Sequence, residues 1–210
     1  MIRAITWFCP NHCGVLMPGV DSWTRPSPAT TSSEEMLAFI GRPVKYFPRM
    51  TREARSCLAA ANLSLGACGW NETESREIGL VAAGYEGCLA ADQEYFRDYV
   101  ASGRTLGRGN LFIYTLPTST MGEVAIALGL KGPTLHIHDA AHPASVLAAQ
   151  ARRLVDDGEA GAILALWSDR QSAVCFAIER SAEHGGLPEF DWDKSPTEMA
   201  QALAAMVEPT

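Results

Sequence analysis

The chain has 210 residues, of which 47% are hydrophobic, and its formal net charge is −7. This length and apolar content are enough for a sizeable core and exclude disorder throughout. The acidic balance, without a long basic run, argues against a nucleic-acid partner. No stretch approaches the roughly 20 apolar residues that span a bilayer, so we expect no membrane partner. We therefore expect residues 1–210 to form a single domain.

The N-terminal segment MIRAITWFCPNHCG is too short and too polar for a secretory signal. Six cysteines without such a signal predict reduced thiols and a cytoplasmic protein. Cys9, His12 and Cys13 are close enough in sequence to form half of a zinc site, but no second pair follows at similar spacing. Burial near the end of a first strand explains these residues better than a metal does.

The predicted elements alternate along the chain. Apolar runs rich in β-forming residues predict strands over residues 2–8, 77–84, 134–140, 161–168 and 172–179. Apolar residues at helical spacing predict helices over residues 51–69, 89–103, 120–133 and 143–158. Residues 18–35 hold three prolines and many hydroxyl side chains, which predicts a long loop.

A C-terminal tail, residues 187–210, is predicted to contain one helix. Ser195 is its expected N-cap, Pro196 its first residue and Glu198 the partner that closes a capping box. Met199, Leu203 and Met206 are expected on its apolar side. This helix is long enough to cover part of a neighbouring apolar face.

The order of these elements predicts an α/β fold. Continuous apolar strands that alternate with helices indicate a central mixed sheet, mainly parallel and of about five strands, with helices on both faces. The segment GRTLGRGN lacks the Lys-Ser/Thr ending of a phosphate-binding loop and does not follow a strand directly. The sequence therefore gives no support to a nucleotide cofactor, and we expect no cofactor.

Three of the five histidines lie in HIHDAAHPAS, residues 136–145. One interpretation is a metal-dependent hydrolase that uses His136, His138, Asp139 and His142, although this spacing does not match the H-x-H-x-D-H order of metallo-β-lactamases. A second interpretation is a pair of partly buried histidines in a strand at a subunit interface. A third is that His142, next to Ala141, faces a ligand or a partner's pocket.

Several segments resemble the N-terminal half of β-ketoacyl synthases, in the thiolase superfamily. IRAITWFCPNHCGVLMPGVDSW is similar to their opening strand and loop, and RMTREARSCLAAANLSLGACGW to their first helix. The most telling segment, residues 114–169, follows the pattern of a helix ending in Gly-Leu-x-Gly-Pro, a strand, the nucleophile turn, a long helix and an Ala-rich strand. The resemblance covers most of residues 1–186 and implies a thiolase-like half fold.

The departures from this family pattern concern its chemistry. Counting from Gly132-Pro133, the family's nucleophilic cysteine falls at Ala141, whose methyl group cannot attack a thioester. The two histidines that assist decarboxylation belong to the family's second half, which this sequence does not include. The chain resembles the short chain-length-factor subunits of aryl polyene pathways, which lack the cysteine and pair with a complete ketosynthase. We therefore expect no catalytic residue and no condensing activity by the chain alone.

The resemblance also implies where an acyl chain would lie. It places Leu116 and Met121 near a growing chain, and Ala141 and His142 close to a partner's active site, so these four are the candidate substrate-binding residues. We expect association through the strand edge at residues 133–140, with a full-length ketosynthase as a heterodimer or with a second copy as a homodimer.

Two further interpretations concern acyl carriers and acyl ligands. Arg152 and Arg153 form a helix face that is either solvated or docks an acidic acyl carrier protein. The remaining alternative is a stand-alone acyl-binding protein. Fatty acid or polyketide biosynthesis is the expected setting of the ketosynthase-like role.

Overall fold

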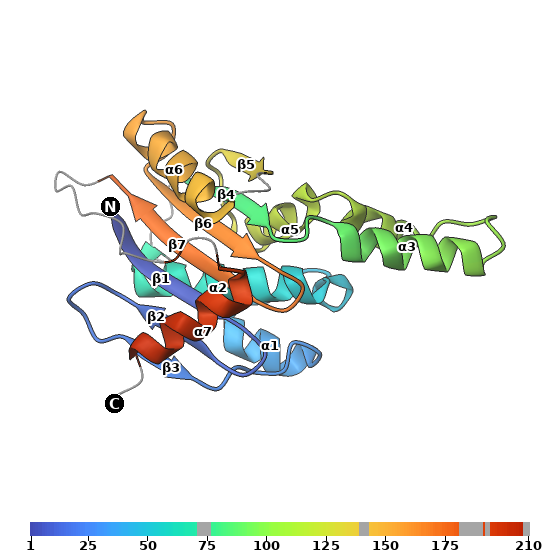
Figure 1. Ribbon diagram of the computed structural model, residues 1–210, viewed down its shortest axis with the longest axis horizontal. Helices are drawn as coiled ribbons and strands as arrows, with labels where there is room; N and C mark the ends of the chain where they lie inside the picture. Colours follow the sequence, from blue (N-terminus) through green and yellow to red (C-terminus); the bar gives the residue numbers. More distant parts are fainter. Residues whose placement is uncertain (71–76, 139–142, 181–190, 192–193, 208–210) are drawn as a thin grey trace.

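The computed structural model describes residues 1–70, 77–138, 143–180, 191 and 194–207. Its centre is a seven-stranded sheet with the strand order β3-β2-β1-β7-β6-β4-β5 (Figure 1). The strands are β1 (Ile2–Phe8), β2 (Cys13–Leu16), β3 (Trp23–Arg25), β4 (Ile78–Gly84), β5 (Thr134–Ile137), β6 (Ala162–Ser168) and β7 (Ala173–Glu179). All five predicted strands are present.

The sheet is mixed, as predicted, but the expectation of a mainly parallel sheet of about five strands is wrong, because four of the six pairings among its seven strands are antiparallel. Strand β4 runs parallel to both β5 and β6, whereas β7 is antiparallel to β6 and to β1. Strands β1, β2 and β3 form an antiparallel meander that the sequence did not predict. Strands β2 and β3 are short and depend on pairing with β1 and with each other, which no local pattern in the sequence records.

The helices lie on both faces of the sheet (Figure 1). They are α1 (Ser33–Ile40), α2 (Arg52–Ala67), α3 (Leu89–Ala101), α4 (Gly109–Phe112), α5 (Thr118–Leu128), α6 (Pro143–Asp156) and α7 (Pro196–Val207), with 3₁₀ turns η1 (Phe47–Arg49) and η3 (Ile113–Thr115). Helix α1 begins inside the predicted loop 18–35, with Ser32 as its N-cap. The prediction of a continuous loop there is wrong, because a capped amphipathic segment ends it.

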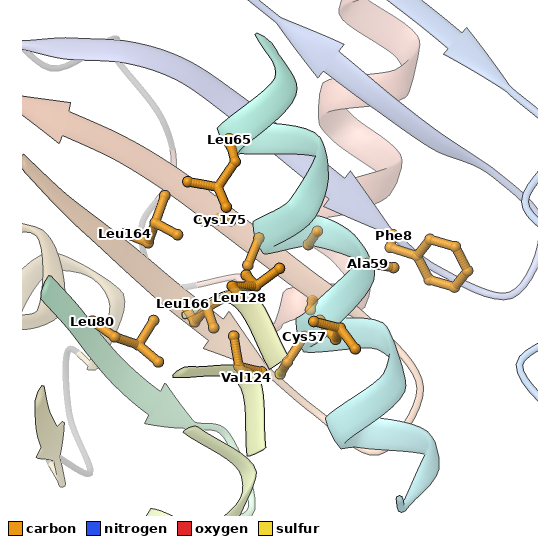
Figure 2. Close-up of a cluster of buried hydrophobic side chains, with 14 of the residues drawn as sticks. Phe8, Cys57, Ala59, Leu65, Leu80, Val124, Leu128, Leu164, Leu166 and Cys175 are labelled. Carbon is orange, nitrogen blue, oxygen red and sulfur yellow. The ribbon is translucent and has the colours of Figure 1, made fainter. Parts of the chain in front are cut away.

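One face of the sheet packs against α2 and α5. Helix α2 lies across this face, and its inner side is rich in alanine, which allows close approach to the strands (Figure 2). Leu80, Leu164 and Leu166 reach this cluster from β4 and β6. Their strand neighbours point to the opposite face, so both faces of β6 are covered and all seven of its residues are buried.

The opposite face packs against α6 and α7. Helix α6 buries one stripe of small and aliphatic side chains, while Arg153 on its other side is exposed. Helix α7 buries Met199 and Leu203, as predicted, but Met206 is 60% exposed. The placement of Met206 on the apolar side is wrong, since Ala200 and Ala204 occupy the buried positions next to Met199 and Leu203.

The predicted capping box begins helix α7. The Ser195 hydroxyl accepts a hydrogen bond from the Glu198 backbone N–H at 3.3 Å, and the Glu198 carboxylate accepts one from the Ser195 backbone N–H at 2.9 Å. These two bonds satisfy backbone donors that the first turn of a helix otherwise leaves unpaired. Pro196 is the first helical residue, as predicted.

Helices α3 and α4 extend beyond the sheet as a projecting arm, residues 89–115 (Figure 1). No residue of α3 is buried. The arm exposes six large apolar side chains, Leu89, Phe96, Val100, Leu106, Phe112 and Ile113. Among the described residues no single helix has the length and apolarity to cross a membrane; one bent pair, Gly109–Thr115 with Thr118–Leu128, meets those criteria when taken together.

Candidate functional site

A cavity of about 630 Å³ lies at the carboxyl ends of β4 and β6, and we call it the β4–β6 cavity. Its walls come from the start of α2, the β4–α3 turn, α3, the α4–α5 region, β5 and the β6–β7 turn. The buried part of its lining is mainly apolar and comprises Met50, Cys57, Ala83, Tyr114, Met121, Leu166 and Ser168. The size and the apolar wall suit a small organic ligand.

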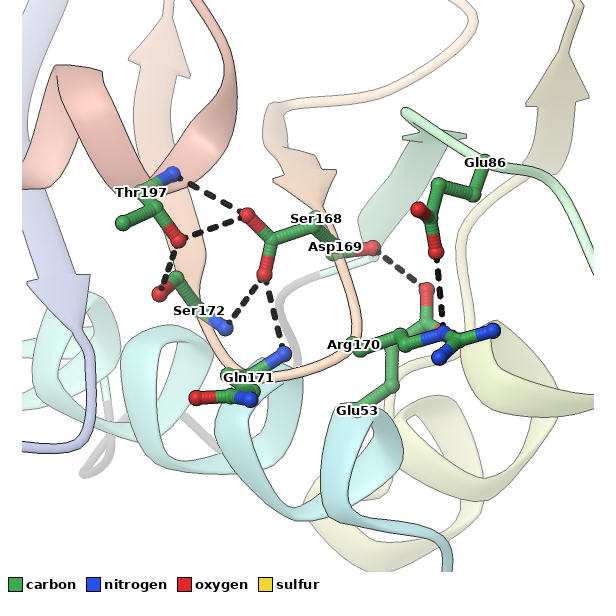
Figure 3. Close-up of polar contacts among 8 residues, drawn as sticks. All are labelled: Glu53, Glu86, Ser168, Asp169, Arg170, Gln171, Ser172 and Thr197. Carbon is green, nitrogen blue, oxygen red and sulfur yellow. Dashed lines mark hydrogen bonds and ion pairs between the residues drawn. The ribbon is translucent and has the colours of Figure 1, made fainter. Parts of the chain in front are cut away.

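The exposed rim of the cavity is charged. It carries Arg49, Arg52, Glu86, Glu94, Arg97 and Arg170. Arg170 and Glu86 form an ion pair at 3.0 Å that joins the β6–β7 turn to the β4–α3 turn (Figure 3). An apolar wall behind a charged rim fits an amphiphile that has an apolar chain and a polar end.

Glu53 is a partly buried carboxyl in the wall of this cavity. Its Oε1 accepts a hydrogen bond of 2.8 Å from the Ser168 hydroxyl, which lies at the end of β6 (Figure 3). Burial raises the pKa of Glu53 to about 7, because the bond from Ser168 only partly offsets it, and the charges of Asp169 and Glu86 raise it further. Within the described residues no cation lies at ion-pair distance from Glu53. A substantial fraction of Glu53 is therefore a neutral acid near pH 7.

Two thiols line the cavity, and neither is activated. Burial raises the pKa of Cys57 well above its ordinary value, and the nearby Glu53 charge raises it further. Burial also raises the pKa of Cys88, helped by its hydrogen bond to Asp92. A nucleophilic cysteine needs a lowered pKa, so these two side chains act as wall residues.

Two of the four candidate substrate-binding residues line this cavity. Met121 is buried in its wall and Leu116 lies at its edge with 53% of its side chain exposed. Ala141 and His142, the other two, lie outside the described residues. The structure thus brings together Leu116 and Met121 with Glu53, which the sequence did not single out.

The histidine segment divides between the cavity and solvent. His136 lies on β5, lines the cavity and is half-buried, and its neighbour His138 is exposed. Burial lowers the pKa of His136, and the charge of His138 lowers it further. Within the described residues, no three His, Cys, Asp or Glu side chains form a group that could hold a metal, while Asp139 and His142 lie outside them.

The residues of CPNHC have packing and hydrogen-bonding roles. The Trp7 indole N–H donates to His12 Nδ1 at 3.0 Å, and the Cys9 thiol donates to the His12 carbonyl oxygen at 3.0 Å. Cys13 is fully buried on β2. Burial raises the pKa of both thiols, which agrees with the interpretation as buried residues.

Arg152 and Arg153 lie on the solvent side of α6. They form ion pairs of 3.7 Å and 3.3 Å with Asp156 and Asp157, one turn further along the helix. Paired surface residues of this kind contribute little to stability.

No protein-family model matches the chain, and no curated protein matches it in sequence. Solved structures do match. "The ishigamide ketosynthase/chain length factor" has a TM-score of 0.62 at 15% identity, covering 87% of this chain and 63% of that chain. A β-ketoacyl synthase from Burkholderia phymatum has a TM-score of 0.60 at 14% identity, covering 86% of this chain and 58% of that chain.

A third match is a ketosynthase, ApeO, in complex with its chain length factor, ApeC, from Xenorhabdus doucetiae. The TM-score is 0.55 at 12% identity, and the alignment covers 87% of this chain and 79% of that chain. This chain therefore spans less than two thirds of the first two structures but most of the matched chain in the third. The chain has the thiolase-like fold that ketosynthases and ketosynthase/chain length factor complexes share.

Proposed function

We propose that this chain is a non-catalytic, chain-length-factor-like subunit that pairs with a full ketosynthase in fatty acid or polyketide-type biosynthesis. The observation that carries the proposal is the β4–β6 cavity, with its apolar wall and charged rim, on a ketosynthase-like fold. Two of the matched structures are described as ketosynthase and chain length factor together. In this role the chain binds part of a growing acyl chain and does not condense it.

The raised pKa values of the two thiols that line the cavity support a non-catalytic role. The position that the family pattern gives to the nucleophile holds Ala141. Cys57 and Cys88, which line the cavity, have raised pKa values and so hold little thiolate at neutral pH. Acyl transfer by a cysteine needs the thiolate, so in this proposal the partner ketosynthase catalyses the condensation.

Two surfaces support the existence of a partner. Strand β5 is the last strand at one end of the sheet, and Thr134 and Leu135 on it are exposed. An exposed edge strand offers unpaired backbone groups to another chain. The projecting arm adds six exposed apolar side chains. A partner that covered both surfaces would remove this apolar area from water.

Pairing is tested by co-expressing the chain with a complete ketosynthase from the same genome and measuring complex formation by sedimentation. We expect a stable heterodimer, or a homodimer when the chain is alone at micromolar concentration. Leu135→Lys places a charge on the β5 edge and should weaken association at least tenfold. Val20→Lys, at a side chain that is 59% exposed elsewhere on the surface, is the matched control. A monomer that binds no ketosynthase would contradict the proposal.

The role of the cavity is tested through product length in the reconstituted pair. Met121→Trp fills the buried wall of the cavity and should shift products toward shorter chains. Ile126→Trp is the matched control, because Ile126 lies on the same helix but is 79% exposed and outside the cavity lining. Equal product lengths for the wild type and the Met121 variant would show that the growing acyl chain does not enter this cavity.

A further inference from the structure

Glu53 is a carboxyl of the β4–β6 cavity lining that is partly buried, whereas Glu86 and Glu94 lie on the exposed rim. The buried part of that lining includes Cys57 on α2, Ala83 on β4 and Leu166 on β6. Carboxylates in such surroundings are normally paired with a cation or with several donors. Here the partner in the described part of the chain is the Ser168 hydroxyl.

The hydrogen-bond geometry leaves a donor for a ligand. Ser168 donates to Glu53 Oε1 at 2.8 Å, so that oxygen is an acceptor. A protonated carboxyl has one O–H donor in addition to its acceptor oxygen. With Oε1 engaged by Ser168, the O–H group on the other oxygen is left to donate to a partner.

Other charged and titratable groups line the same cavity as Glu53. Asp169 and Arg170 lie on the β6–β7 turn, Glu86 and Cys88 on the β4–α3 turn, Arg52 and Cys57 on α2, Tyr114 on η3 and His136 on β5. Asp169 and Glu86 favour the neutral form of Glu53. Arg170 on the rim forms its ion pair with Glu86 and none with Glu53.

We propose that the β4–β6 cavity selects an acyl chain that carries a carbonyl oxygen, and that Glu53 is the specificity-determining residue, donating a hydrogen bond to that oxygen as a carboxylic acid. This inference rests on the proposed function, in which an acyl chain enters the cavity. It adds a substrate class: a 3-oxoacyl chain binds better than a saturated chain of the same length. The neutral acid costs less to bury against an apolar chain than a carboxylate does.

The test compares binding of 3-oxodecanoyl pantetheine and decanoyl pantetheine to the full chain by calorimetry. At pH 6 the wild type should prefer the 3-oxo chain by roughly two- to tenfold, which is the value of one hydrogen bond. Its affinity for that chain should fall roughly tenfold between pH 6 and pH 8, as the protonated fraction of a group with a pKa of about 7 falls.

Two variants separate the hydrogen bond from the charge. Glu53→Gln keeps a donor but cannot ionise, so it should keep the preference for the 3-oxo chain and bind it equally at pH 6 and pH 8. Glu53→Met removes the donor and should bind the two chains equally. Glu159→Gln, at an exposed residue outside the cavity, should behave as the wild type. Should Glu53→Met fail to fold, the proposal is still tested by the pH dependence of 3-oxo chain binding, which the wild type should show and Glu53→Gln should not.

Each failure has a distinct meaning. Equal affinity of the wild type for both chains at pH 6 would overturn the role of Glu53 while leaving acyl binding in place. Binding of decylamine that strengthens from pH 6 to pH 8 would overturn it in favour of a site for cations. If neither thioester binds the isolated chain or its complex with a ketosynthase, acyl binding in this cavity is wrong, and both the inference and that part of the proposed function fall.

Discussion

Asp169 accepts two hydrogen bonds from Thr197, one from its backbone N–H at 3.1 Å and one from its hydroxyl at 2.7 Å (Figure 3). The other carboxylate oxygen of Asp169 accepts the backbone N–H groups of Gln171 and Ser172 at 2.9 and 2.8 Å. A single carboxylate therefore fixes the β6–β7 turn and the first turn of α7. The negative charge also lies at the N-terminus of α7, where the helix dipole favours it.

Asp169→Ala should lower the free energy of unfolding by about 2–3 kcal/mol, because four donors lose a charged acceptor. Urea unfolding measures the change, and hydrogen exchange should show the loss of protection concentrated in α7. Asp157→Ala is the matched control, since Asp157 is exposed and makes one surface ion pair with Arg153; its effect should stay below about 1 kcal/mol. Equal effects for the two variants would show that Asp169 does not hold α7.

Glu53 should make stability depend on pH. Its folded-state pKa is raised from 4.5 to about 7, so the folded chain binds this proton more tightly than the unfolded chain does. The resulting stabilisation is complete below about pH 4.5 and is lost as the pH rises through 7. Between pH 5 and pH 8 the wild type should lose about 1–3 kcal/mol more than Glu53→Gln does. Urea unfolding at several pH values checks this, and parallel curves for the two proteins would contradict it.

Gly132 and Gly122 should respond in opposite ways to alanine. A Cβ at Gly132 would lie 2.6 Å from the Gly79 backbone nitrogen, whereas a Cβ at Gly122 in α5 meets nothing within 4 Å. Gly132→Ala should therefore cost more than about 2 kcal/mol. Gly122→Ala should stabilise by up to about 1 kcal/mol through helix propensity. Thermal unfolding of the two variants measures both changes. A loss of stability at Gly132→Ala well below about 2 kcal/mol would contradict the prediction, because it would mean that the backbone of β4 at Gly79 moves aside at little cost.

Five of the seven strands and most helices were predictable, and for the four seven-residue strands the reason is that burial shapes their sequences. Strand β6 is apolar at all seven positions, since helices cover both of its faces. The α7 capping box was predictable because it is local. Strands β2 and β3 were not, because they are short and depend on pairing with β1, which no local pattern records. Met206 was misplaced because the buried stripe of α7 includes alanines, whose small side chains give a weak signal.

The candidate site was predictable in part. The family resemblance led to Leu116 and Met121, and both line the cavity. It did not lead to Glu53, because a glutamate in the first turn of a helix is ordinary and its sequence neighbours give no sign of burial. Glu53 is hydrogen-bonded in the cavity wall to Ser168, which is 115 residues away from Glu53 along the chain. The packing of the start of α2 against the end of β6 places Glu53 and Ser168 together.

Zinc content distinguishes the ketosynthase-like interpretation from the hydrolase interpretation. The spacing from His136 to His142 does not fit a known H-x-H hydrolase order, and His136 faces the same cavity as Leu116 and Met121. We expect elemental analysis of the purified protein to find less than stoichiometric zinc. One zinc per chain that disappears in the His136→Ala and His138→Ala double variant would favour the hydrolase.

Incubation with malonyl- and acyl-carrier protein, without a partner enzyme, should give neither condensation product nor an acylated thiol on this chain. The physical reason is that position 141 holds alanine and that burial raises the pKa of Cys57 and Cys88, so these two cavity thiols hold little thiolate. Intact-protein mass spectrometry detects acylation, and Cys57→Ser and Cys88→Ser variants locate it. Product formation that either serine variant abolishes would make this chain an enzyme with a displaced nucleophile. Product that appears once a complete ketosynthase is added would instead assign the condensation to the partner.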